Sequence, residues 1–108
     1  MVRDSLDAII LQDLEGTILA WNPAAARMYG WSESEALKLN IQSLIPEGLA
    51  EEQRKQVQQL SKKKVLKPYQ TQRLTKEGER IAVWLTATAL LNDKGALYAI
   101  ATTERQSD

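Results

Sequence analysis

The side chains that could do chemistry in this sequence are carboxylates, hydroxyls and lysine amines, because it contains no cysteine and no histidine. Thiolate nucleophiles, disulfides, metal sites built on thiolate or imidazole ligands, histidine-ligated haem and Ser-His-Asp triads are therefore excluded. No closely spaced pair of acidic residues lies in an apolar segment, where burial would tune one carboxyl as an acid and the other as a base. We therefore expect a protein that is not an enzyme.

Length and composition limit the class of protein further. The chain has 108 residues, of which 44% are hydrophobic and 26% charged, enough for one domain with its own core. Its 14 basic and 14 acidic residues give a formal net charge of zero, so no overall positive field attracts nucleic acid. No apolar run approaches the roughly 20 residues that span a bilayer. We expect one cytoplasmic domain over residues 1–108, with no contact to nucleic acid or membrane.

The first two elements expected in the chain are strands that form a hairpin. Residues 8–14 and 17–21 are short apolar runs, and Glu15-Gly16 separates them. Two such runs around a turn of this kind are typical of paired antiparallel strands.

Two short helices are expected directly after this hairpin. Asn22 offers a side-chain oxygen for an N-cap, and Pro23 suits the first helical position, where its missing N–H costs nothing. Gly30 can end this helix in the left-handed conformation. Ser32, with Glu35 three residues later, predicts a capping box at the start of a second helix.

The middle of the chain predicts a third short segment and a longer helix. Residues 41–45 are apolar and stop at Pro46. Residues 47–64 place acids in the first turn and lysines in the last. A narrow apolar stripe runs along one face, through Leu49, Gln53, Val57 and Leu60. We interpret Lys62–Lys64 as the solvated end of this helix rather than a nucleic-acid patch, because no aromatic residues are interleaved with it.

The last third of the chain consists of predicted strands at residues 69–75, 80–91 and 96–103, with turns between them. Strands at both ends of the chain and helices in the middle predict an α+β fold, with helices packed on one face of an antiparallel sheet.

Taken in order, these motifs resemble the PAS sensory domain family. They run through DAIILQDLEGTILAWNPAAARMYGWSESEAL, then SLIPE, then RLTKEGERIAVWLTATALLNDKGALYAIATTER. Each motif alone is weak, but the ordered set covers nearly the whole chain. The resemblance implies a five-stranded antiparallel sheet cupping helices over a small internal cleft. The last segment is similar to PAS segments of bacterial sensor kinases and of chemotaxis methyltransferase or methylesterase fusions.

The resemblance makes the cleft the place to look for a ligand. Our candidate contacts are Met28, Trp31, Asn40, Ile41, Leu44, Tyr69, Trp84 and Thr86. A noncovalent flavin stays open through Tyr69 and Asn40, whereas a cysteinyl-flavin adduct is excluded, so the cofactor is unknown. Tyr69 could equally start a strand and pack on the core, and Met28 and Trp31 could be core residues.

The long strand at residues 80–91 has two faces to assign. By alternation Trp84 and Thr86 share one face, which we expect to line the cleft, although threonine is also simply a good strand former. The outer face would then carry Val83, Leu85 and Ala87. An apolar surface of this kind is usually buried against a partner. We expect a homodimer through these three residues.

The function expected from this resemblance is regulatory. A domain of this family, as part of a longer bacterial signalling protein, would bind a small molecule or a partner and relay the signal to an output domain. The alternative is a ligand-free dimerisation domain of the PAS type.

Overall fold

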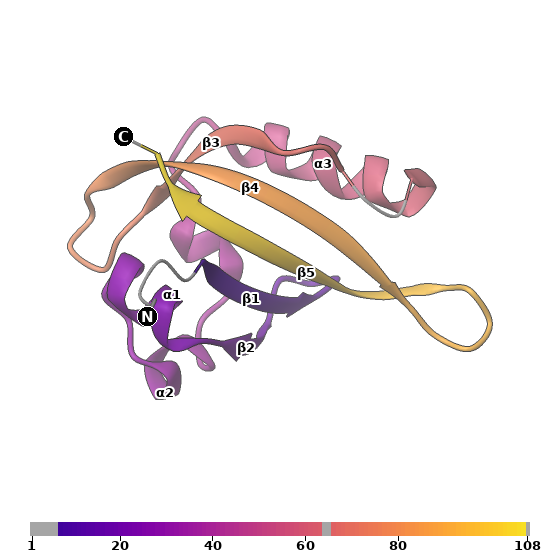
Figure 1. The fold of residues 1–108 in the computed structure, drawn as a ribbon, viewed down its shortest axis with the longest axis horizontal. Coiled ribbons are helices and arrows are strands. Elements are labelled where there is room, and N and C mark those ends of the chain that lie inside the picture. The colour runs from indigo at the N-terminus through magenta and orange to yellow at the C-terminus, as the bar shows by residue number, and fades with distance from the viewer. Residues whose placement is uncertain (1–6, 64–65, 108) are drawn as a thin grey trace, which may run out of the picture.

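The computed structural model describes residues 7–63 and 66–107, and Figure 1 shows their arrangement. Five strands form one antiparallel sheet in the order β2-β1-β5-β4-β3. Their bounds are β1 (Ala8–Asp13), β2 (Ile18–Trp21), β3 (Tyr69–Leu74), β4 (Arg80–Leu91) and β5 (Leu97–Gln106). The predicted α+β class and five-stranded sheet are confirmed.

All the helices lie in the connection between β2 and β3. They are α1 (Pro23–Tyr29), α2 (Glu33–Ala36), the 3-10 helix η1 (Ile41–Leu44) and α3 (Ala50–Lys63). In Figure 1, α1 and α2 gather near β1 and β2, whereas α3 runs alongside β3 at the other edge of the sheet. None of the helices in the described ranges is long and apolar enough to cross a membrane. Lys64, the last of the predicted basic run, falls outside these ranges.

The helix signals in the first half of the chain are confirmed. The Asn22 side chain accepts the N–H of Ala25 at 2.9 Å and so caps α1. Gly30 ends α1 with a φ of 86°, a conformation that favours glycine. The capping box of Ser32 and Glu35 starts α2. The hairpin turns slightly earlier than expected, because the Asp13 side chain accepts backbone N–H groups of the turn.

The two faces of β4 are opposite to those we expected. Val83, Leu85 and Ala87 are at most 3% exposed and point toward the helices, whereas Trp84 is 47% exposed on the outer face. Cross-strand register agrees, since Leu85 pairs with the buried Glu104 of β5. The predicted dimer contact through Val83, Leu85 and Ala87 is therefore wrong. The physical reason is that the helices pack on this face, which leaves it no surface for a partner.

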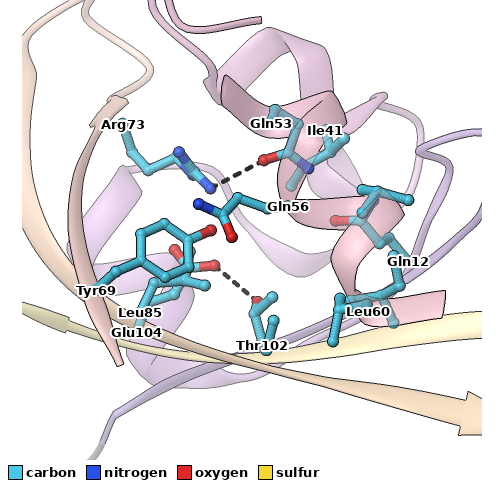
Figure 2. Close-up of a pocket in the computed structure, with 13 residues that line it drawn as sticks. Gln12, Ile41, Gln53, Gln56, Leu60, Tyr69, Arg73, Leu85, Thr102 and Glu104 are labelled. Carbon is cyan, nitrogen blue, oxygen red and sulfur yellow. Dashed lines mark hydrogen bonds between the residues drawn. The ribbon is translucent and has the colours of Figure 1, made fainter. Parts of the chain in front are cut away.

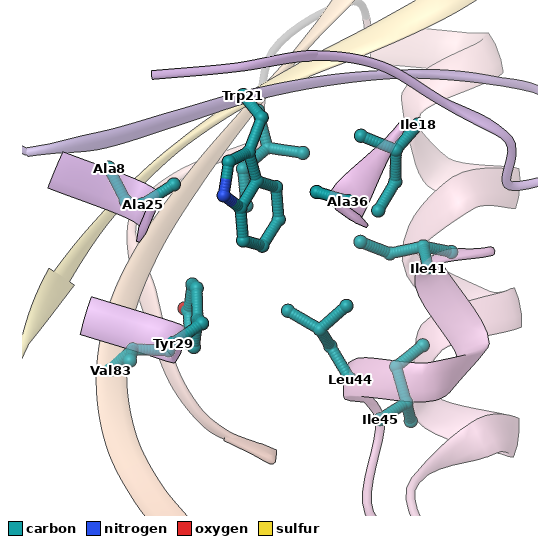
Figure 3. Close-up of a cluster of buried hydrophobic side chains, with 11 residues drawn as sticks. Ala8, Ile18, Trp21, Ala25, Tyr29, Ala36, Ile41, Leu44, Ile45 and Val83 are labelled. Carbon is teal, nitrogen blue, oxygen red and sulfur yellow. The ribbon is translucent and has the colours of Figure 1, made fainter. Parts of the chain in front are cut away.

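The inner face of the sheet carries two apolar clusters, and we call the first the main core. The main core lies beneath α1, α2 and η1, and Figure 3 shows its side chains. It is made of Ala8, Ile10, Ile18, Trp21, Ala25, Tyr29, Ala36, Ile41, Leu44, Ile45 and Val83.

The second apolar cluster, which we call the α3 cluster, lies where α3 covers β4 and β5. It is made of Leu60, Leu66, Leu85, Ala87, Ala89 and Ile100. Small alanines on β4 let the helix approach the sheet closely, and the partly buried Val57 and Tyr69 pack at its border.

Candidate ligand-binding cleft

A small cavity lies between α3 and the inner face of the sheet, and Figure 2 shows its walls. Its volume is about 20 Å³, which is room for one water molecule. Its apolar floor belongs to the α3 cluster. Its polar wall is formed by Gln12, Gln53, Gln56, Arg73, Thr102 and Glu104. We call this cavity the cleft.

Glu104 is the most deeply buried charged residue of the cleft, at 1% exposed. Strand alternation places it and Thr102 on the inner face of β5. One carboxylate oxygen accepts the hydroxyl of Tyr29, and the other accepts the hydroxyl of Thr102 at 2.7 Å. Each oxygen of Glu104 therefore already has a hydrogen-bond partner within the protein.

Tyr29 reaches the cleft from the end of α1, on the main-core side. Burial raises the pKa of its hydroxyl, and the neighbouring Glu104 raises it further. The hydroxyl therefore stays protonated and donates to Glu104. This hydrogen bond joins the main core to the cleft across 75 residues of sequence.

Arg73 forms the opposite wall and is only 4% exposed, although it carries a guanidinium. One terminal N–H group donates to the backbone carbonyl of Gln72 at 3.0 Å. The other approaches the side-chain oxygen of Gln53 at a long 3.4 Å. Its Nε has no hydrogen-bond partner in the part of the chain that the structure describes. The guanidinium therefore has donor capacity left over in the cleft.

A wider groove of about 240 Å³ leads toward the cleft between α3 and the β1–β2 turn. Gln12, Ile41, Gln53 and Val57 line both spaces, so the groove forms a mouth to the cleft. The Gln53 side chain stands at this boundary and points toward Arg73, as Figure 2 shows.

Of the residues expected at the cleft, the structure brings Tyr69 and Ile41 to its lining. Leu44 lies in the main core, and Met28 and Trp31 pack against that core instead. These three side chains therefore complete apolar packing rather than line the cleft.

Asn40 has a structural role instead of the expected ligand contact. Its side-chain oxygen accepts the N–H of Gln42 at 3.0 Å and caps η1. Its amide N–H donates to the carbonyl of Glu15 at 2.8 Å, in the β1–β2 turn. Both ends of the amide are thus engaged in holding the mouth of the cleft together.

Trp84 and Thr86 lie outside the cleft, and their expected inward orientation is wrong. They line a shallow outer groove of about 270 Å³ together with Thr103, Arg105 and Asp7. The cause is the reversed face of β4, because a one-residue change in alternation moves every side chain to the other face.

None of the six polar residues of the cleft wall was predicted as a site residue from sequence. Arg73, Thr102 and Glu104 lie on strands, and each alternates with an exposed neighbour. This alternation indicates that the three side chains are buried, provided that the buried face of β4 is known. Gln53 had only its place on the apolar stripe of α3 as a signal.

Comparison with known proteins identifies the family. The profile described as "PAS domain" matches residues 6–105, nearly the whole chain. The chain belongs to the PAS domain family. Sensor protein FixL of Bradyrhizobium diazoefficiens is 46% identical over 41 residues, a match that covers 38% of this chain and only 8% of that protein.

Solved structures agree with this PAS assignment at the level of the fold. The PAS domain of a Colwellia psychrerythraea protein superposes with a TM-score of 0.87 at 20% identity, over 94% of this chain and 86% of that one. A PAS domain from a two-component sensor histidine kinase gives 0.77 at 19% identity, over 94% and 85%. The LOV protein of Rhodobacter sphaeroides gives 0.76 at 18% identity, over 96% and 60%.

A flavin does not fit the cleft of this PAS domain. The cavity of about 20 Å³ is far below the roughly 300 Å³ or more of pockets that hold molecules of that size. Asn40, the residue expected to bind the ring edge, is engaged elsewhere. We assign no flavin-binding role to Tyr69 or Asn40.

Proposed function

We propose that this PAS domain is the sensory module of a signalling protein and responds to a small polar molecule in the cleft beneath α3. The observation that carries the proposal is the buried polar wall of the cleft, where Arg73 Nε has no hydrogen-bond partner among the described residues. Proteins rarely leave such a group without a hydrogen bond, because its desolvation costs about 1–3 kcal/mol or more. A ligand that satisfies it recovers this free energy on binding.

A route from the cleft to the surface runs along β5. Glu104 faces the cleft, and the next residue, Arg105, faces outward by alternation. Arg105 Nε donates to the carboxylate of Asp7 at 3.0 Å, just before β1. A ligand that shifts β5 would therefore also change the contact between the ends of β5 and β1. An output domain outside this sequence would read that change, so the domain itself acts by binding and not by catalysis.

The test is to ask whether the cleft binds small molecules. Native mass spectrometry of the protein as purified, followed by amide NMR titration with a library of polar metabolites, should reveal a bound species. We expect chemical-shift changes at the amides of α3 and Thr102, and further along β5 to Arg105. Ala87→Leu, which fills the floor of the cleft, should abolish them. Ala20→Leu, at an exposed alanine of β2, is the matched control and should not. If no compound of the library shifts the amides around the cleft, the sensory role is refuted.

A second candidate function is dimerisation through the outer face of the sheet. Two large apolar side chains are exposed there, Trp84 at 47% and Ile9 at 52%. The exposed apolar surface supports an interface between two copies, now centred on residues other than those expected from sequence.

Sedimentation equilibrium tests this second candidate. If two copies meet at this face, Trp84→Glu should weaken the dimer, because it would bury an unpaired charge in the contact. Leu37→Glu, at an exposed leucine after α2, is the control and should associate like the parent. A parent that stays monomeric at high micromolar concentration would rule out this function.

A further inference from the structure

The cleft contains two opposite charges that are both buried and are not paired with each other. Arg73 on β3 is 4% exposed, and Glu104 on β5 is 1% exposed. Both side chains line the cleft (Figure 2), yet none of the ion pairs among the described residues joins them. Buried opposite charges gain by pairing, because each has already lost its hydration in the fold. The cleft therefore holds the two partners of an ion pair apart.

Glu104 is held in place and has room for a further donor. Its two oxygens accept the hydroxyls of Tyr29 and Thr102, which are themselves buried. A carboxylate offers about four lone-pair sites, so both oxygens still have acceptor capacity for another N–H group. Glu104 is thus a fixed acceptor on β5.

Arg73, in contrast, is held weakly on the side of α3. The hydrogen bond from its terminal nitrogen to Gln53 is long, at 3.4 Å, and its Nε has no partner among the described residues. A neutral amide is also a weaker acceptor for a guanidinium than a carboxylate is. The guanidinium therefore has a weak partner on α3 and a stronger acceptor in the same cleft on β5.

The two charges act on the same hydroxyl groups. Burial raises the pKa of the Tyr69 hydroxyl, Arg73 opposes this rise, and Glu104 adds to it. Burial and Glu104 likewise raise the pKa of Tyr29, and Arg73 again acts in the opposite direction. Both hydroxyls therefore lie in the field of both charges, as expected if the two charges are close together.

We propose that the guanidinium of Arg73 alternates between Gln53 on α3 and Glu104 on β5, and that the second position requires α3 to move away from the sheet. The size of the cleft imposes this coupling. Its volume of about 20 Å³ has room for one water molecule, which is less than a guanidinium needs. Arg73 therefore reaches Glu104 only when the wall formed by α3 moves outward. The charge-assisted hydrogen bond to Glu104 offsets the packing that is lost there.

The start of α3 stays tied to the sheet when Arg73 releases Gln53. The hydroxyl of Thr71 on β3 donates to Glu52 at 2.8 Å, one residue before Gln53. The two positions of Arg73 thus correspond to two positions of the helix about this contact. This switch goes beyond the proposed sensory function, because it operates in the protein without a ligand. A molecule that favours one position would shift the balance between the two.

Amide hydrogen exchange of α3, measured by NMR on the protein without added compounds, tests the switch. Gln53→Glu supplies a carboxylate on the helix side, so it should hold Arg73 there and slow the exchange of the α3 amides about tenfold or more. The same change on an Arg73→Met background is the matched control. It keeps the effect of the new charge on the helix but removes the partner of that charge, so the slowing should be largely lost.

A second variant removes the other partner of Arg73. Glu104→Gln keeps the shape of the side chain but removes its charge, so the switch predicts slower exchange of α3, because the outward position loses its stabilising bond. A purely structural role of Glu104 predicts the opposite, since weakening its buried bond to Tyr29 would loosen the domain and speed the exchange. Glu79→Gln, at an exposed carboxylate, is the control and should leave the exchange unchanged.

Two results would overturn the switch. The first is equal slowing by Gln53→Glu with and without Arg73, which would assign the effect to the helix charge alone. The second is α3 exchange that Glu104→Gln leaves unchanged or speeds. If Glu104→Gln does not fold, the comparison of Gln53→Glu in the two backgrounds decides alone. The sensory function is tested by the ligand titration, and these exchange rates neither support nor refute it.

Discussion

The main core and the cleft occupy the same face of one sheet, yet they are built in opposite ways. In the main core, Trp21 and Tyr29 pack with their ring centroids 5.8 Å apart, and the indole N–H of Trp21 donates to the carbonyl of Trp31 at 2.9 Å. In the cleft, Arg73 Nε has no partner within residues 7–63 and 66–107, and the mouth lies close to it. The indole N–H of Trp31, which packs against the main core, is also unpartnered among the described residues, but it is uncharged. The two regions therefore differ in that the unpartnered donor of the cleft belongs to a buried cation.

The main core and the proposed ligand site lie in separate halves of this domain. Apolar burial beneath α1, α2 and η1 stabilises the sheet without α3. α3 itself packs through a narrow stripe, which includes Val57 and Leu60, and its polar contacts to β3 are few. Elements of this kind open at lower free energy than the rest of a domain. The helix over the cleft can therefore move while the other half of the molecule holds its shape.

The largest effect should come from the main core. Trp21 is 3% exposed, so Trp21→Ala removes a fully packed ring and should lower the free energy of unfolding by about 3–5 kcal/mol. Urea denaturation followed by circular dichroism measures the loss. A loss below about 1 kcal/mol would mean that this region is no more tightly packed than the cleft, and the contrast between the two would fail.

The next effect concerns the hydrogen bond between the two regions. Tyr29→Phe removes the donor to the buried Glu104 and should cost about 1.5–3 kcal/mol near neutral pH. Tyr98→Phe, at a tyrosine that is 52% exposed, is the matched control and should cost almost nothing. Urea melts of the three proteins give both values.

This tyrosine also predicts a pH dependence with a definite sign. Burial and Glu104 raise the pKa of Tyr29 above its ordinary value of 10.0, so the folded protein keeps a proton that the unfolded chain loses. The stability that Tyr29 contributes is complete below pH 10 and is lost as the pH rises above it. The difference between parent and Tyr29→Phe should therefore narrow by about 1.4 kcal/mol per pH unit above 10. A difference that widens there would contradict the assignment.

Sequence patterns predicted the main core better than the cleft, for a physical reason. Caps and turns act through neighbours in sequence, so Asn22, Gly30 and Ser32 carried enough information to place the helices. The cleft depends on which face of a strand is buried, and β4 is apolar on both faces around Trp84 and Leu85. Alternation gives two sets of residues but does not say which set faces the helices. Arg73 and Glu104 became visible only when cross-strand register fixed that choice.

A smaller loss in the free energy of unfolding is expected when either of two asparagine caps, one in each region, is removed. The Asn22 side chain accepts the N–H groups of Ala25 and Ile9 and donates to the carbonyl of Asp7, so it ties α1 to the first strand. Asn22→Ala should cost about 0.5–2 kcal/mol, near the upper end of that range. Asn40→Ala, at the mouth of the cleft, removes one cap and one turn contact and should cost less. Equal losses in urea melts, or a larger one for Asn40→Ala, would contradict this ranking.

The smallest effect distinguishes the two faces of the sheet. Trp84 is 47% exposed, so Trp84→Ala leaves no internal cavity and should change the free energy of unfolding by about 1 kcal/mol or less. The comparison with Trp21→Ala is direct, because both remove an indole from a strand and differ mainly in burial. Melts at low micromolar concentration keep any association through this face from adding to the result. A loss of about 3 kcal/mol or more would mean that Trp84 lies on the inner face of the sheet and Leu85 on the outer face. Because the cross-strand register fixes which residues share a face, Glu104 and Arg73 would then also lie outside the cleft.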